Sequence, residues 1–158
     1  MDGNAEVLEL LNEVLTAELT AINQYFIDGK MCENWGYERL GKRFYKESID
    51  EMKDAETLIE RILYLEGVPN LQRLGNVRVG EDVPEKLTLA LEVEKEAVAR
   101  LRRGIELCYD RGDHGSRDML EEILNGEESH ADWLEAQITL LDQVGVPNYL
   151  AQQIHDDD

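Results

Sequence analysis

The stretch Glu127-Glu128-Ser129-His130 places a carboxylate and an imidazole three residues apart within an apolar pattern. On an α-helix this spacing puts Glu127 and His130 on the same face. The apolar residues that continue this face on both sides are Leu120, Ile123, Leu134, Ile138 and Leu141. An ionisable side chain within an apolar face must be paired, protonated or bound to something. The stretch therefore predicts a chemical site inside a helical core.

The stretch has a counterpart upstream, Glu51-Met52-Lys53-Asp54, and two single carboxylates, Glu18 and Glu94, interrupt apolar faces of their own. The differences 127 − 51, 130 − 54 and 94 − 18 all equal 76. Chance rarely aligns three such pairs together with matching apolar periodicity. The sequence therefore predicts two copies of a helical hairpin, each contributing a Glu and a Glu-x-x-(His or Asp).

Apolar residues at spacings of three and four predict four long helices. The first, second and fourth cover about residues 4–35, 38–66 and 116–144. The third begins after a cap at Asp82 and extends to about residue 111. Residues 67–83 lack this periodicity, and we interpret them as a long crossover that lets helices two and three run parallel. A short fifth helix is expected over residues 147–154, and the acidic tail Asp156–Asp158 is expected to fray. The prediction is an all-α four-helix bundle in one domain over residues 1–158.

Length and composition support this prediction. The chain has 158 residues, of which 42% are hydrophobic and 32% charged, as expected for amphipathic helices around one core. It contains no run of about 18 apolar residues to span a membrane, and its first four residues do not resemble a secretory signal. The two cysteines, Cys32 and Cys108, have no redox or metal spacing and are interpreted as buried thiols of a cytoplasmic protein.

Net charge excludes one class of partner. The formal charge of −19 argues against nucleic acid, because binding phosphates needs a basic surface. An acidic excess is usual on a solvated surface, and it also fits a protein that attracts cations. Charge alone does not decide between these two interpretations.

The bundle would gather six ionisable side chains at one level of its core: Glu18, Glu51, Asp54, Glu94, Glu127 and His130. Unpaired, such a group is strongly disfavoured there, and basic residues such as Arg43 and Arg61 fall at outward positions. Single acids at this spacing are common on solvated faces, but the 76-residue repeat of the set favours metal cations as the compensation. Carboxylates with imidazole on four helices match the two-metal sites of ferritin-like bundles.

Over essentially its whole length the chain resembles the bacterioferritins. The matching segments are Glu18–Phe26, Glu47–Lys53, Leu65–Gln72 and Glu127–His130. The resemblance implies a ferritin-like fold and a hollow 24-subunit shell built from dimers, with the short fifth helix at the fourfold axes. It also implies ferroxidase activity, in which two ferrous ions per subunit are oxidised by dioxygen or peroxide and stored as ferric mineral. In that family the residues at these six positions hold the two iron ions. The glutamates equivalent to Glu51 and Glu127 bridge the two ions.

Met52 is a second candidate site. It follows Glu51 and so points about 100° away from the metal-binding face, and a lone Met on a helix flank is usually packing. The resemblance implies that Met52 from two subunits ligates one haem b at a twofold interface, where thioether ligation raises the haem potential. It further implies bacterioferritin-associated ferredoxin as the partner for iron release.

Asp54 departs from the family motif, which has His at that position. The ligating atoms of Asp and of a δ-bound His both lie two bonds beyond Cβ, so we expect Asp54 to ligate as a harder anionic donor. Five ionised acids carry a charge of −5, against +4 for two ferrous and +6 for two ferric ions. The more anionic ligand set is expected to favour the bound ferric pair and so to slow the transfer of iron into the cavity. The alternative is a haem-bearing subunit with an impaired di-iron centre, structural or electron-transferring, in a mixed shell with a His-containing second bacterioferritin subunit. A DNA-protecting mini-ferritin is disfavoured because the repeat places the ligands within one subunit and no basic tail is present.

Overall fold

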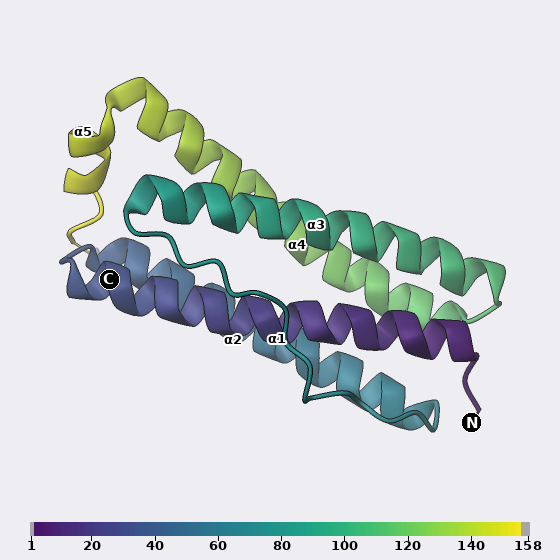
Figure 1. The fold of residues 1–158 in the computed structure, drawn as a ribbon. Coiled ribbons are helices and arrows are strands. Elements are labelled where there is room, and N and C mark those ends of the chain that lie inside the picture. The colour runs from purple at the N-terminus through teal and green to yellow at the C-terminus, as the bar shows by residue number, and fades with distance from the viewer. Residues whose placement is uncertain (1, 156–158) are drawn as a thin grey trace.

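The computed structural model describes residues 2–155, and four long helices with a short fifth one form its framework (Figure 1). The helices are α1 (Ala5–Asn34), α2 (Glu38–Tyr64), α3 (Val83–Asp110), α4 (His114–Val144) and α5 (Val146–Ala151). In Figure 1, α1 lies along α2 and α3 lies along α4, and α5 folds back across one end of the bundle. The predicted all-α four-helix bundle, with its crossover between α2 and α3 and its fifth helix, is confirmed.

Three predicted boundaries differ from the structure by two residues or more. Helix α2 ends at Tyr64 rather than at about residue 66. Helix α4 begins at His114 rather than at residue 116, because Asp113 caps it by accepting a hydrogen bond from the Ser116 backbone N–H at 3.0 Å. Helix α5 ends at Ala151, not at residue 154. The tail Asp156–Asp158, which was expected to fray, lies outside the described residues.

Caps and positive-φ residues set most helix ends. The side chain of Asn4 accepts from the backbone N–H groups of Glu6 and Val7, and Asp82 accepts from Glu85 N at 2.9 Å at the start of α3. Helix α4 stops before Gly145, whose φ of 85° lies in the left-handed region that glycine adopts without strain. These local signals fix where each helix presents its apolar face.

The crossover, residues 65–82, is bonded to α1 by polar side chains of that helix. Asn12 donates to the carbonyl of residue 68 at 3.1 Å and accepts from the N–H of residue 70 at 2.8 Å. Thr20 accepts from Gly75 N at 2.8 Å, and Gln24 accepts from Arg78 N at 3.1 Å. Because these acceptors recur along one side of α1, the extended crossover follows that helix for much of its length (Figure 1).

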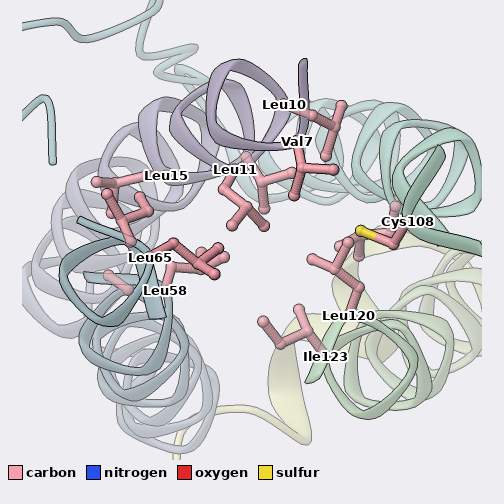
Figure 2. Close-up of a cluster of buried hydrophobic side chains, with 13 residues drawn as sticks. Val7, Leu10, Leu11, Leu15, Leu58, Leu65, Cys108, Leu120 and Ile123 are labelled. Atoms are coloured by element: carbon pink, nitrogen blue, oxygen red, sulfur yellow. The ribbon is translucent and has the colours of Figure 1, made fainter. Parts of the chain in front are cut away.

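Two apolar clusters fill the bundle interior. Figure 2 shows the first, which gathers residues from all four long helices, among them Leu11, Leu58 and Leu120. The second lies towards α5 and includes Tyr25, Phe44 and Leu134. Burying a leucine or phenylalanine side chain stabilises the fold by about 1.5–3 kcal/mol. The ionisable residues predicted from the sequence occupy the level between the two clusters.

The two cysteines are buried free thiols, as predicted. Burial raises the pKa of Cys32 to about 12 and that of Cys108 to about 11, so both stay protonated and unreactive. In the described part of the chain, no helix combines the length and the apolar character needed to cross a membrane.

Candidate metal centre

The structure brings together all six ionisable residues predicted for the centre. Each long helix contributes: Glu18 from α1, Glu51 and Asp54 from α2, Glu94 from α3, and Glu127 and His130 from α4. Five of them are nearly inaccessible, with exposed fractions between 1% and 4%, whereas Asp54 is partly exposed. Helical spacing of three or four residues within α2 and α4 explains why each of these helices supplies two.

Their donor atoms form two overlapping groups, in each of which one atom per residue lies within 4.8 Å of the others. The first group comprises Glu51, Glu94, Glu127 and His130, and the second comprises Glu18, Glu51, Asp54 and Glu127. Glu51 and Glu127 belong to both. Two neighbouring cations could therefore occupy this level, with two carboxylates positioned between them.

Several donor atoms lack partners within the protein. Among the described residues, Glu18 Oε2, Glu94 Oε2 and His130 Nε2 are buried without a hydrogen bond. A buried carboxylate oxygen without a partner costs about 1–3 kcal/mol or more. Because oxygen and imidazole nitrogen are donors that iron accepts, these atoms fit a metal site better than a closed structural network.

Glu94 is held by two neighbours. The Tyr25 hydroxyl donates to Glu94 Oε1 at 2.5 Å, and His130 Nδ1 lies 2.9 Å from the same oxygen. Burial raises the pKa of Glu94, but hydrogen bonds from Glu127 and His130 outweigh it and hold that pKa below its ordinary value. Glu94 is therefore ionised in the metal-free protein.

Three other acids of the centre, Glu51, Asp54 and Glu127, resist ionisation. Burial, followed by the charge of Glu94, raises the pKa of Glu51 well above its ordinary value. Burial and the charge of Glu51 do the same to Glu127. Burial and the neighbouring acid Asp50 raise the pKa of Asp54 from 3.8 to about 7. The metal-free centre thus retains protons that an entering cation would displace.

Two contacts near His130 were not predicted from the sequence. Glu47, which is 6% exposed, places Oε2 at 3.5 Å from His130 Nδ1 and accepts from Arg43 Nε at 2.9 Å. The Arg43 guanidinium also lies 4.1 Å above the Trp133 ring. Arg43 was assigned to an outward position; its side chain is 33% exposed, and its guanidinium nevertheless reaches Trp133 on α4. The position of Glu47 near the centre could be expected from the sequence, because it lies four residues before Glu51 on the same helix face.

A cavity of about 1010 Å³ connects the centre with the surface. It is bounded by α1, α3 and the crossover, and it reaches Glu18, Glu51, Glu94 and Glu127. Its outer part carries both charges, from Glu9, Glu13 and Glu96 and from Arg73, Arg78 and Arg100. Because the cavity joins the acids of the centre to the surface, it is a candidate entry route.

Met52 lies on the outer surface of α2, where its side chain is 50% exposed. Phe26 and Tyr45, whose rings lie 6.4 Å apart, are also about half exposed. Large exposed apolar side chains on neighbouring helices indicate a surface that another molecule can cover. The exposed thioether of Met52 fits an axial ligand of haem. One subunit supplies one such sulfur at this surface.

Comparison with known proteins agrees with this geometry. A family model described as a ferritin-like domain matches residues 8–144. A bacterioferritin of Mycobacterium leprae is 49% identical over 152 residues, which is 96% of each chain. A bacterioferritin of Streptomyces coelicolor is 50% identical over 154 residues, covering 98% of this chain and 92% of the relative. A bacterioferritin of Brucella melitensis is 42% identical over 149 residues, or 94% and 92% of the two chains. The chain therefore belongs to the bacterioferritins, within the ferritin-like family.

Proposed function

We propose that this protein stores iron and that each subunit is a ferroxidase, oxidising Fe²⁺ to Fe³⁺ at the centre formed by the four long helices. The observation that carries the proposal is the pair of donor groups that share Glu51 and Glu127. Unpartnered oxygens of Glu18 and Glu94 within these groups support it further. Membership of the bacterioferritins agrees with iron as the substrate.

The charges of the centre suit a change from Fe²⁺ to Fe³⁺. Five ionised carboxylates carry −5, so two Fe²⁺ ions leave a net charge of −1 and two Fe³⁺ ions a net charge of +1. With dioxygen as oxidant, each Fe²⁺ gives one electron, and O₂ takes both with two protons to form H₂O₂. Glu51 and Glu127 release their protons as the cations bind, because the positive charge offsets the repulsion that raises their pKa.

The remaining residues position this chemistry. Tyr25 and His130 both contact Glu94 Oε1 and so orient the carboxylate towards the centre. The cavity beside α1, whose inner end is lined by acids of the centre, supplies Fe²⁺ from the surface. Asp54, one turn beyond Glu51, completes the donor group on the Glu18 side.

A second function is favoured by Asp54 itself. It takes the place of the imidazole in the family motif, and burial with the charge of Asp50 raises its pKa to about 7, so a cation that binds there displaces a proton. The alternative is therefore a haem-bearing subunit with an impaired centre that shares a mixed shell with a His-containing subunit. Rapid oxidation by the homogeneous protein argues for the first function and against the second.

We also propose a 24-subunit shell that binds haem b at its twofold interfaces. Met52, Phe26 and Tyr45, all about half exposed on α1 and α2, support a dimer contact in which Met52 from each subunit ligates one haem. Bound there, haem supplies reversible one-electron transfer. Family membership supports bacterioferritin-associated ferredoxin as the electron donor for iron release.

Stopped-flow spectroscopy of the metal-free shell tests the ferroxidase proposal. Fe²⁺ is added in steps under dioxygen, and the ferric absorbance of the first rapid phase is recorded. The expected amplitude saturates at two Fe²⁺ per subunit, and Glu94→Gln removes the rapid phase. Oxidation without saturation, or an unchanged rapid phase in the variant, would contradict the proposal.

A further inference from the structure

The two donor groups of the centre differ in chemistry. One group offers carboxylate oxygen alone, from Glu18, Glu51, Asp54 and Glu127. The other combines carboxylates with an imidazole, from Glu51, Glu94, Glu127 and His130. Glu51 and Glu127 belong to both groups. We therefore name each metal position by the two residues that it does not share: the Glu18–Asp54 position and the Glu94–His130 position.

We propose that the Glu18–Asp54 position selects hard, oxygen-seeking divalent cations of the Mn²⁺ class, while the Glu94–His130 position favours cations that also take nitrogen. The centre then accepts two different metals side by side. This inference rests on the proposed function, because it assumes that cations occupy both positions, and it adds a second substrate class at the same centre.

Donor type supplies the selectivity. Carboxylates suit Mg²⁺, Ca²⁺ and Mn²⁺, whereas imidazole suits zinc, copper, iron and nickel. Zn²⁺ binds more tightly than Mn²⁺ at most sites of either kind. The meaningful quantity is therefore the ratio of Mn²⁺ to Zn²⁺ affinity, which should be higher at the Glu18–Asp54 position.

A buried oxygen shows that this position is built to receive a ligand. Glu18 is 3% exposed, and its Oε2 has no hydrogen-bond partner among the described residues. It lies in the same donor group as Asp54, and that group consists of carboxylates alone. A cation is the direct way to compensate this oxygen.

The surroundings make the Glu18–Asp54 position the exchangeable one. The cavity reaches Glu18 and Glu94 alike, and Glu18 and His130 are equally buried, so the difference lies in the remaining contacts. Asp54 is partly exposed to solvent, whereas Glu94 Oε1 is already engaged by the Tyr25 hydroxyl. A free cation therefore enters and leaves the Glu18–Asp54 position more easily.

Pulsed EPR of the intact metal-free shell, loaded with one Zn²⁺ and one Mn²⁺ per subunit, tests the inference. In the native protein, Zn²⁺ should occupy the Glu94–His130 position and Mn²⁺ the all-oxygen one, so the Mn²⁺ signal should lack coupling to a bound nitrogen. The variant Asp54→His gives both positions an imidazole, so its Mn²⁺ signal should acquire that coupling. A nitrogen-coupled Mn²⁺ signal in the native protein would overturn the inference.

Competition binding gives a second readout. Asp54→His should lower the ratio of Mn²⁺ to Zn²⁺ affinity at this position about tenfold, equivalent to about 1.4 kcal/mol. Glu56→Gln is the matched control, because Glu56 is an exposed acid on the same helix that belongs to neither donor group. A ratio that Asp54→His leaves unchanged, or that Glu56→Gln shifts equally, would contradict the role of Asp54.

The two proposals fail in different ways. Saturable Fe²⁺ oxidation together with nitrogen-coupled Mn²⁺ would overturn the selectivity and leave the ferroxidase standing. Nitrogen-free Mn²⁺ binding without rapid Fe²⁺ oxidation would support the selectivity and overturn the ferroxidase. Because EPR and competition binding involve no turnover, they report on the position whether or not iron is oxidised.

Discussion

Replacing Asp54 with Asn should stabilise the metal-free protein above neutral pH. Burial, followed by the charge of Asp50, raises the pKa of Asp54 from 3.8 to about 7. A carboxylate with a raised pKa destabilises the fold where it is ionised. This unfavourable contribution is absent below pH 3.8, grows as pH rises, and is complete above about pH 7. Asparagine has nearly the same shape and no charge, so it removes the contribution.

The magnitude follows from the two pKa values. A difference of about three pKa units corresponds to about 4 kcal/mol. Because Asp54 is partly exposed, solvent screening reduces this value, and we expect about 2 kcal/mol at pH 8. For a chain of this length that gain raises the melting temperature by roughly 4–8 °C. At pH 5 the gain falls to about a third, because most of the ionisation in the folded state has been reversed.

Differential scanning calorimetry of the metal-free shell at pH 5 and pH 8 measures the effect. Glu56→Gln serves as the control, since this exposed acid on the same helix is not among the neighbouring charges that chiefly raise the pKa of Asp54. With saturating Mn²⁺, the native protein should have a higher melting temperature than Asp54→Asn, because the cation stabilises the ionised carboxylate. A metal-free Asp54→Asn protein that melts below the native one at pH 8 would refute the reasoning.

Three further predictions concern other parts of the subunit. Met52→Leu should abolish haem absorbance while the shell still assembles, and haem retained by the variant would refute its role as ligand. Asp54→His makes the donor set less anionic and should speed the transfer of ferric iron from the centre to the cavity; faster transfer in the native protein would count against this. Arg61→Ala removes hydrogen bonds of 2.8 Å to Asp113 and 2.9 Å to Ser116, which join α2 to the start of α4. It should cost about 2 kcal/mol in calorimetry, and an unchanged melting temperature would contradict it.

The repeat in the sequence was enough to predict the fold class and the six residues of the centre. Apolar periodicity identified the helices, and an acid within an apolar face is informative because it is costly when buried. Glu18 and Glu94 were identifiable in this way although each stands alone on its helix. The boundary of α4 could have been predicted as well, since Asp113 followed by Ser116 is a capping pattern.

Other contacts depend on how the helices pack. Lys86 and Asp28 are both fully buried and pair at 2.9 Å, yet they lie on different helices. Periodicity does not indicate which helix faces lie together or how far a long side chain reaches. For the same reason the approach of Arg43 to Trp133 and the cavity beside α1 could not be inferred from spacing.

Anomalous diffraction from a crystal soaked aerobically with ferrous salt tests the central claim most directly. We predict two iron peaks in each subunit, one bounded by Glu18 and Asp54 and the other by Glu94 and His130, with Glu51 and Glu127 between them. A single peak beside His130 would show that Asp54 disables its position. The absence of both peaks would contradict the assignment of this centre to iron.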